Sequence, residues 1–126
     1  MSSPNPNSLA SVWPTSLKVD AAKRVLTISF DGGEVFAIEA ELLRVNSPSA
    51  EVQGHSPDQR VTQSGKRNVT IRDMVATGNY AVRIVFDDGH DTGIFTWAYL
   101  HELGRDGPSL WQAYLTELNT KSLTRG

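Results

Sequence analysis

The sequence of 126 residues contains no cysteine. Disulfide bonds, thiolate nucleophiles, iron–sulfur ligation by Cys and the common structural zinc sites are therefore excluded. No run of about 18 apolar residues is present, so a membrane span is not expected. Neither sign of charge dominates, because 12 Lys and Arg oppose 14 Asp and Glu for a formal net charge of −2. A dedicated nucleic-acid-binding protein is usually clearly basic, so nucleic acid is not an expected partner.

The first residues also lack charge and long apolar stretches. Residues 1–8 have no basic region followed by an apolar one, so we expect no signal peptide and a cytoplasmic location. The Pro, Ser and Asn there predict a flexible tail over 1–15. We expect one domain over 16–104 and a C-terminal helix with a frayed end over 105–126. A monomer is the expected state.

Alternation of apolar and polar residues predicts several strands. The pattern is present at 17–19, 26–30, 35–38, 69–71, 80–86 and 92–96. Asp31-Gly32-Gly33 is typical of a hairpin turn between two of these strands. Good helix formers at 39–44 predict one or two helical turns after that hairpin. Strands and helices do not alternate regularly, which favours an α+β fold with a mostly antiparallel sheet.

The second half of the chain predicts a long loop and two helices. Residues 47–68 contain Pro48, Gly54, Pro57 and Gly65 and few apolar residues, so we expect a loop that is functional or mobile. The basic residues of this region, Arg60, Lys66, Arg67 and Arg72, are expected to be solvated. A helix over 97–103 should end at Gly104, and a last helix should begin near Pro108. Trp111, Tyr114, Leu115 and Leu118 give this last helix an apolar face.

The densest polar cluster is the segment Asp87–Asp91, with three carboxylates, Gly89 and His90. These residue types favour a tight turn, and they are also metal ligands. His55 is expected to be solvated, and His101 is expected to lie at the edge of the core or on an exposed face and not to be a metal ligand. A Ser–His–Asp arrangement has no support, because no Gly-x-Ser-x-Gly nucleophile turn occurs. Phosphate-loop and dinucleotide-binding motifs are also missing.

Two longer segments carry a resemblance to a known family. They are LLRVNSPSAE at 42–51 and GNYAVRIVFDDGHDTGIFTW at 78–97, followed by Leu100. Together they resemble the gamma-butyrobetaine hydroxylase-like N-terminal domain in its small stand-alone bacterial form. The resemblance implies a small β-rich α+β domain. Such domains also precede iron- and 2-oxoglutarate-dependent hydroxylases and accompany ATPases that assemble iron–sulfur clusters.

In the hydroxylases the resemblance implies a zinc site of three cysteines and one histidine. The histidine corresponds to His90, and the cysteines correspond to Ser47, Ser49 and Val52. Serine is a poor zinc ligand and valine is none, so we expect no zinc and no other cofactor here. The segments around positions 47 and 90 should still lie side by side. Hydrogen bonds from Asn46, Ser47 or Ser49 could then hold the His90 turn.

Three functions remain open, and the first is favoured. It is a non-catalytic interaction module that binds another protein through Arg44, Asn46, Ser47, Ser49, Glu51, Arg83, Asp87, Asp88, Gly89, His90 and Asp91. Phe95, Trp97 and Tyr99 could add anchors if they are exposed. The alternative is an accessory role in metal or iron–sulfur metabolism, with weak divalent-metal binding by Asp88, His90 and Asp91. The third is a small enzyme with His90 as general base, although no catalytic apparatus is visible.

Overall fold

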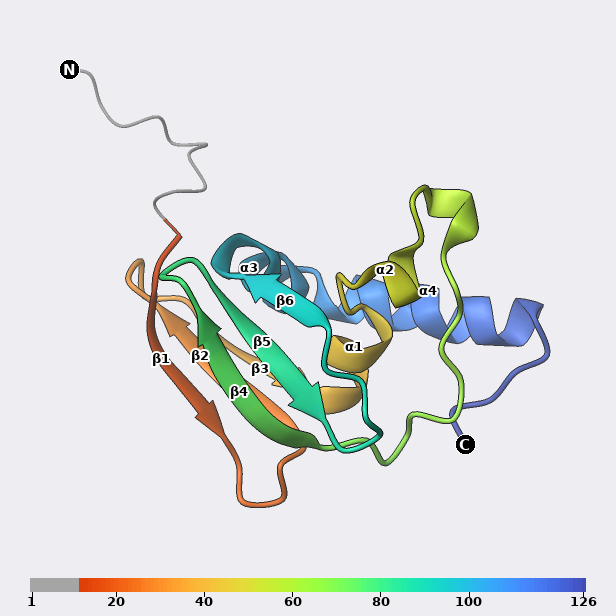
Figure 1. Ribbon diagram of the computed structural model, residues 1–126, viewed down its shortest axis with the longest axis horizontal. Coiled ribbons are helices and arrows are strands. Elements are labelled where there is room, and N and C mark those ends of the chain that lie inside the picture. Colours follow the sequence, from red (N-terminus) through yellow and green to blue (C-terminus); the bar gives the residue numbers. More distant parts are fainter. Residues whose placement is uncertain (1–11) are drawn as a thin grey trace.

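Two three-stranded antiparallel sheets form the frame of the protein. A computed structural model describes residues 12–126, and Figure 1 shows the second sheet in front of the first. The first sheet has the order β1-β2-β3, with β1 Pro14–Val19, β2 Val25–Phe30 and β3 Val35–Glu39. The second has the order β4-β5-β6, with β4 Ile71–Thr77, β5 Ala81–Phe86 and β6 Gly93–Thr96. The predicted α+β class with antiparallel strands is confirmed.

One hydrophobic core joins the inward faces of the two sheets. Alternate residues of β2 (Leu26, Ile28 and Phe30) are buried, and those between them are half-buried. In β5 the buried series ends in Ile84 and Phe86, and these side chains belong to the same cluster as those of β2. The period-2 pattern of the sequence therefore places one face of each sheet in a shared core.

Helices pack along one side of this frame, to the right of and behind the sheets in Figure 1. They are α1 (Ala40–Val45), α2 (Ala50–Gln53), the 3-10 turn η2 (Pro57–Gln59), α3 (Trp97–Arg105) and α4 (Gly107–Thr120). All six residues of α1 are buried. From α4, Tyr114 and Leu118 pack with Val45 of α1 in a second small cluster. The predicted apolar face of the last helix is thus used in packing.

The region 47–68 is more ordered than its composition predicts. It contains α2 and η2, which are too short to show a helical period in the sequence. The guanidinium of Arg60, expected to be solvated, bonds Glu117 Oε2 at 3.1 Å and the Val45 carbonyl at 3.0 Å. Lys66 Nζ lies 2.6 Å from Asp88 Oδ2. The prediction of a solvated basic loop is therefore wrong for these two side chains.

Two predicted boundaries also differ from the structure. Helix α3 continues through Gly104 to Arg105. Gly104 lies against an aromatic ring, since an added Cβ would be 2.4 Å from Phe36 Cγ. Close packing, and not a helix C-terminus, explains the glycine. Strand β4 begins at Ile71 and runs to Thr77, past the predicted 69–71. An irregular register between Ile71 and Asp73 breaks the alternation that the prediction needed.

The two ends of the chain complete the description. Residues 1–11 of the tail expected over 1–15 lie outside the described residues. Strand β1 begins at Pro14, within the range that was expected to be tail. The expected frayed end instead makes contacts: Arg125 Nη2 lies 2.8 Å from Glu41 Oε1, and the Arg67 amide donates to the Arg125 carbonyl at 2.8 Å. Within residues 12–126, no helix combines the length and apolarity needed to cross a membrane.

Candidate functional site

The structure brings the segment after α1 against the turn between β5 and β6. His90 Nε2 lies 2.8 Å from Ser47 Oγ, and His90 Nδ1 lies 3.1 Å from Glu51 Oε1. The hydroxyl of Thr92 lies 2.9 Å from Ser49 Oγ and 3.0 Å from Glu51 Oε1. Residues 39 to 43 positions apart in the sequence thus meet in one polar cluster, as the resemblance led us to expect.

Local backbone chemistry shapes both halves of this cluster. Pro48 follows the end of α1, and Ser49 begins α2 by accepting a hydrogen bond from the Glu51 amide at 3.1 Å. In the opposite turn, Gly89 has a φ of +93°, which few residues with a side chain adopt. Asp88 Oδ1 accepts the His90 amide at 3.1 Å and so fixes the position of the imidazole.

A second part of the cluster is ionic and centres on Asp88. Its Oδ2 lies 2.9 Å from Arg44 Nε and 2.6 Å from Lys66 Nζ. Partial burial alone would raise the pKa of Asp88, but hydrogen bonds from Lys66, the His90 amide and Arg44 outweigh it and lower the pKa to about 2. The side chain of Arg44 is only 8% exposed. Arg44 is therefore an internal residue, and it holds the more exposed Asp88, whose side chain is 22% exposed, by an ion pair.

Folding favours the neutral form of the His90 imidazole. Burial is the main cause that lowers its pKa, and the positive charge of Arg44 adds to it, while Glu51 and Asp88 oppose the shift. An ionised Glu51 can only accept a hydrogen bond, so the proton is assigned to Nδ1 and Nε2 accepts from the Ser47 hydroxyl. The result is a chain from hydroxyl to imidazole to carboxylate, which we call the Ser47–His90–Glu51 tie.

This tie has the connectivity of a serine hydrolase triad, which the sequence patterns did not predict. In a hydrolase the serine is accessible and the carboxylate is buried, whereas here the exposure of the two is reversed. Ser47 is fully buried, whereas the side chain of Glu51 is 64% exposed. An added Cβ on Gly93 would lie 2.3 Å from Ser47 Oγ, so the backbone of β6 closes over the hydroxyl. A substrate carbonyl has no access there, and the tie is a structural link.

The carboxylates of the Asp87–Asp91 turn diverge. Asp87 Oδ1 accepts the Thr70 amide at 2.9 Å, and Asp91 lies next to Arg83, whose Nη1 bonds the Asp91 carbonyl at 3.1 Å. Across residues 12–126, no three His, Cys, Asp or Glu side chains gather in a way that could hold a metal ion. A metal at this turn would need Asp88 and His90 to leave the partners they have.

Other candidate residues have structural contacts of their own. Asn46 is buried, donates from Nδ2 to the Leu42 carbonyl at 3.1 Å, and accepts the Tyr99 hydroxyl at its backbone carbonyl. Phe95 is fully buried, so it is not an exposed anchor. Of the histidines outside the turn, His55 is exposed, and His101 packs edge-on against Phe30 at the margin of the core.

Sequence reasoning missed two members of the cluster. Thr92 lies within the segment that carries the resemblance, but nothing in its spacing marks it as a partner of Glu51. Lys66 lies 22 residues before its partner Asp88, in a region expected to be a loop. No sequence signal could have identified this pair, because only the path of residues 60–70 along the turn brings the two together.

The fold and the cluster define a small α+β domain in which one polar tie joins a helix end to a hairpin turn. The family model described as "Gamma-butyrobetaine hydroxylase-like, N-terminal" matches residues 17–101, so the chain belongs to this family. The resemblance drawn from the two sequence segments is confirmed.

Solved structures similar to this chain agree with that assignment. Two solution NMR structures are each 42% identical to this chain. The first has a TM-score of 0.78, and the match covers 91% of this chain and 90% of the other. The second has a TM-score of 0.79, and the match covers 99% of this chain and 91% of the other. A crystal structure of a DUF971 family protein of unknown function from Acidithiobacillus ferrooxidans is 34% identical, with a TM-score of 0.60 over 72% of this chain and 91% of its own. No curated protein matches the chain.

Proposed function

We propose that the protein is a non-catalytic interaction module that binds another protein. Its docking surface, the rim face, consists of the exposed or half-exposed side chains that the polar cluster holds in place: Glu51, Arg83, Asp87, Asp91 and Ile94. The observation that carries the proposal is that the buried hydroxyl of Ser47 and the imidazole of His90 bond each other, and that Asp88 bonds Arg44 and Lys66. The exposed side chains around this cluster are the ones that a partner can reach.

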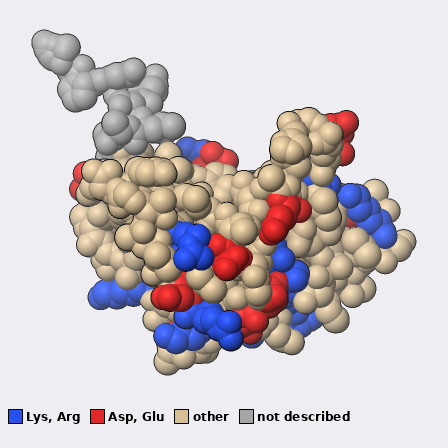
Figure 2. Space-filling view, in the orientation of Figure 1, with Lys and Arg blue, Asp and Glu red and all other residues tan. Residues whose placement is uncertain are grey.

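The composition of the rim face supports a partner whose binding surface has basic groups around an apolar group. Glu51 is 64% exposed, Asp91 is 55% exposed and Arg83 is 37% exposed. Ile94 is 42% exposed and pairs with Arg83 across β5 and β6. Figure 2 shows acidic and basic side chains gathered in the lower and central part of this side, with a largely uncharged surface to the upper left. Complementary charges of this kind favour specific and fast association.

In this proposal the Ser47–His90–Glu51 tie takes the structural place of the zinc site that the resemblance implies for the hydroxylases. A serine hydroxyl, a neutral imidazole and a carboxylate can bond one another without a cation. The family description also supports a role beside a separate catalytic part, because it names an N-terminal region and not the hydroxylase itself. Within residues 12–126, no group of three His, Cys, Asp or Glu side chains supports an accessory role with a weakly bound metal.

Affinity purification from the native cell with matched variants tests the proposal. The double variant Glu51→Gln, Asp91→Asn removes two charges from the rim face, and Asp31→Asn, Asp58→Asn removes two exposed charges elsewhere. We expect proteins that are retained by the wild type and the control, lost with the rim variant, and released as ionic strength rises. If the same proteins bind all three chains equally, the rim face is not the docking surface.

A further inference from the structure

Strand β3 is an edge strand. It pairs with β2 on one side, and within residues 12–126 no strand pairs with its other side. Val35 is 60% exposed, and Ala37 and Glu39 are also exposed. An open strand edge presents unpaired backbone groups that can pair with another chain.

The ladder with β2 shows which backbone groups of β3 point outward. The Ala40 amide bonds the Arg24 carbonyl at 2.7 Å, and the Phe30 amide bonds the Glu34 carbonyl at 2.8 Å. In an antiparallel pair, hydrogen-bonded and non-hydrogen-bonded positions alternate, so even-numbered positions of this strand face β2. The N–H and C=O of Ala37 and the N–H of Glu39 consequently point away from the sheet.

This edge lacks features that protect the margin strands β1 and β4. Strand β1 carries Pro14 and Lys18 and has an irregular register, and β4 also has an irregular register. Proline, lysine and bulges are the usual features that prevent a further strand from adding. The sequence of β3, Val-Phe-Ala-Ile-Glu, has neither proline nor lysine, and its register with β2 is regular.

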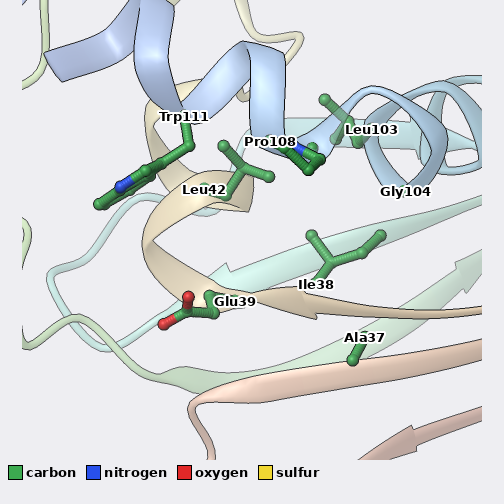
Figure 3. A pocket seen from close by; sticks show the side chains of 9 residues that line it. Ala37, Ile38, Glu39, Leu42, Leu103, Gly104, Pro108 and Trp111 are labelled. Carbon is green, nitrogen blue, oxygen red and sulfur yellow. The ribbon is translucent and has the colours of Figure 1, made fainter.

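A pocket of about 280 Å³ lies along the same edge. Its walls are residues 37–39 of β3 on one side and Leu42, Leu103, Pro108 and Trp111 on the other, as Figure 3 shows. Ligand pockets usually enclose about 300–1,000 Å³, so this one suits a single large apolar side chain better than a cofactor. An added strand would direct every second side chain toward it.

The charge at the mouth of the pocket is negative. Glu39 lines the pocket, its side chain is exposed, and it forms no ion pair with another residue in the described part of the chain. The nearby Glu41 is already paired with Arg125, which also lies 4.9 Å over the Trp111 ring. A basic residue is therefore the complementary neighbour for an apolar side chain seated in the pocket.

We propose that β3 accepts an extended segment of a partner protein as an added strand, with an apolar side chain in the pocket and a basic residue beside Glu39. Main-chain hydrogen bonds at Ala37 and Glu39 provide the affinity, and the pocket and the carboxylate provide the specificity. The site uses none of the residues of the rim face. It therefore goes beyond the proposed function, and either can fail without the other.

The probe is the blocked pentapeptide Ser-Lys-Leu-Lys-Ser, titrated to about 10 mM into the full chain labelled with ¹⁵N. We expect saturable shifts at the Ala37 and Glu39 amides and at the Trp111 indole. Methylation of the peptide's backbone nitrogens should weaken binding at least about tenfold, because it removes the donors that a strand needs. This arm leaves the protein unchanged, so it does not depend on the folding of a variant.

Variants test the two sides of the site separately. Ala37→Pro removes the outward N–H and should weaken binding about tenfold. Glu39→Gln should weaken binding about two- to fivefold, and Asp31→Asn, with the same charge change, should leave it unchanged. The proposal is overturned if no saturable shift occurs at 10 mM peptide, or if binding survives both Ala37→Pro and N-methylation, which would indicate a pocket for a small apolar ligand.

Discussion

The bond between Ser47 and His90 can be tested by removing one oxygen atom. Ser47→Ala deletes the hydroxyl that donates to His90 Nε2 at 2.8 Å. The mutation leaves a buried ring nitrogen without a partner, since His90 is 7% exposed and the surrounding backbone admits no new group. An unsatisfied buried acceptor costs about 1–3 kcal/mol. For a domain of this size that corresponds to a fall in melting temperature of about 4–15 °C.

A double-mutant cycle measures the bond itself. His90→Ala also removes the contact with the ring of Phe86, whose centroid lies 6.1 Å away, so it should be more destabilising than Ser47→Ala. When the two changes are combined, the loss should be smaller than the sum of the single losses by about 1 kcal/mol or more, because neither partner is then left unpaired. Chemical denaturation followed by circular dichroism gives the free energies of unfolding.

An exposed serine provides the control for Ser47→Ala. Ser109→Ala changes an exposed serine and should alter stability by less than about 0.5 kcal/mol. If Ser47→Ala is as mild as this control, the tie does not stabilise the fold. If the two single changes add to within about 0.3 kcal/mol, the hydroxyl and the imidazole act independently and the reasoning fails.

Three further predictions concern stability. Folding lowers the pKa of His90 below 6.5 and the pKa of Asp88 from 3.8 to about 2, so the unfolded chain binds more protons than the folded one. The free energy of unfolding should therefore fall as the pH drops below about 6.5, and fall again below about 4. A melting temperature that does not change with pH would contradict this. Gly93→Ala should cost about 1–3 kcal/mol, because the new Cβ would overlap the buried hydroxyl of the tie; a neutral result by denaturation would show that the turn can move. Arg125→Ala should cost about 1–3 kcal/mol by leaving Glu41, 6% exposed, unpaired, and Glu41→Gln should restore part of it.

Periodicity predicted the strands and helices whose packing is regular. The alternation at 26–30 and 80–86 corresponds to β2 and β5, whose inward residues form the core. Prediction failed where a residue is determined by a distant contact. Gly104 was predicted to end a helix, but the position has no room for a side chain because Phe36 packs against it. A pattern within one segment contains no information about the side chain that another segment brings to it.

For the candidate site too, the sequence predicted some contacts and missed others. The family motif predicted that Ser47 and His90 would meet, since both belong to segments that the resemblance brought together. It did not predict that Arg44 and Asp88 would be an internal ion pair completed by Lys66. Charged side chains are most often exposed, so the burial of Arg44 could be recognised only from the packing of α1.

The two surfaces proposed for partners are joined by α1. This helix begins directly after Glu39 at the strand edge and carries Arg44, near its end, into the polar cluster. All six of its residues are buried, so it cannot shift without opening the core. Transmission between sites needs an element with two discrete arrangements, and the burial of α1 on all sides opposes a second one. If both proposed surfaces bind partners, we expect α1 to hold the two partners at a fixed spacing and not to relay a signal between them.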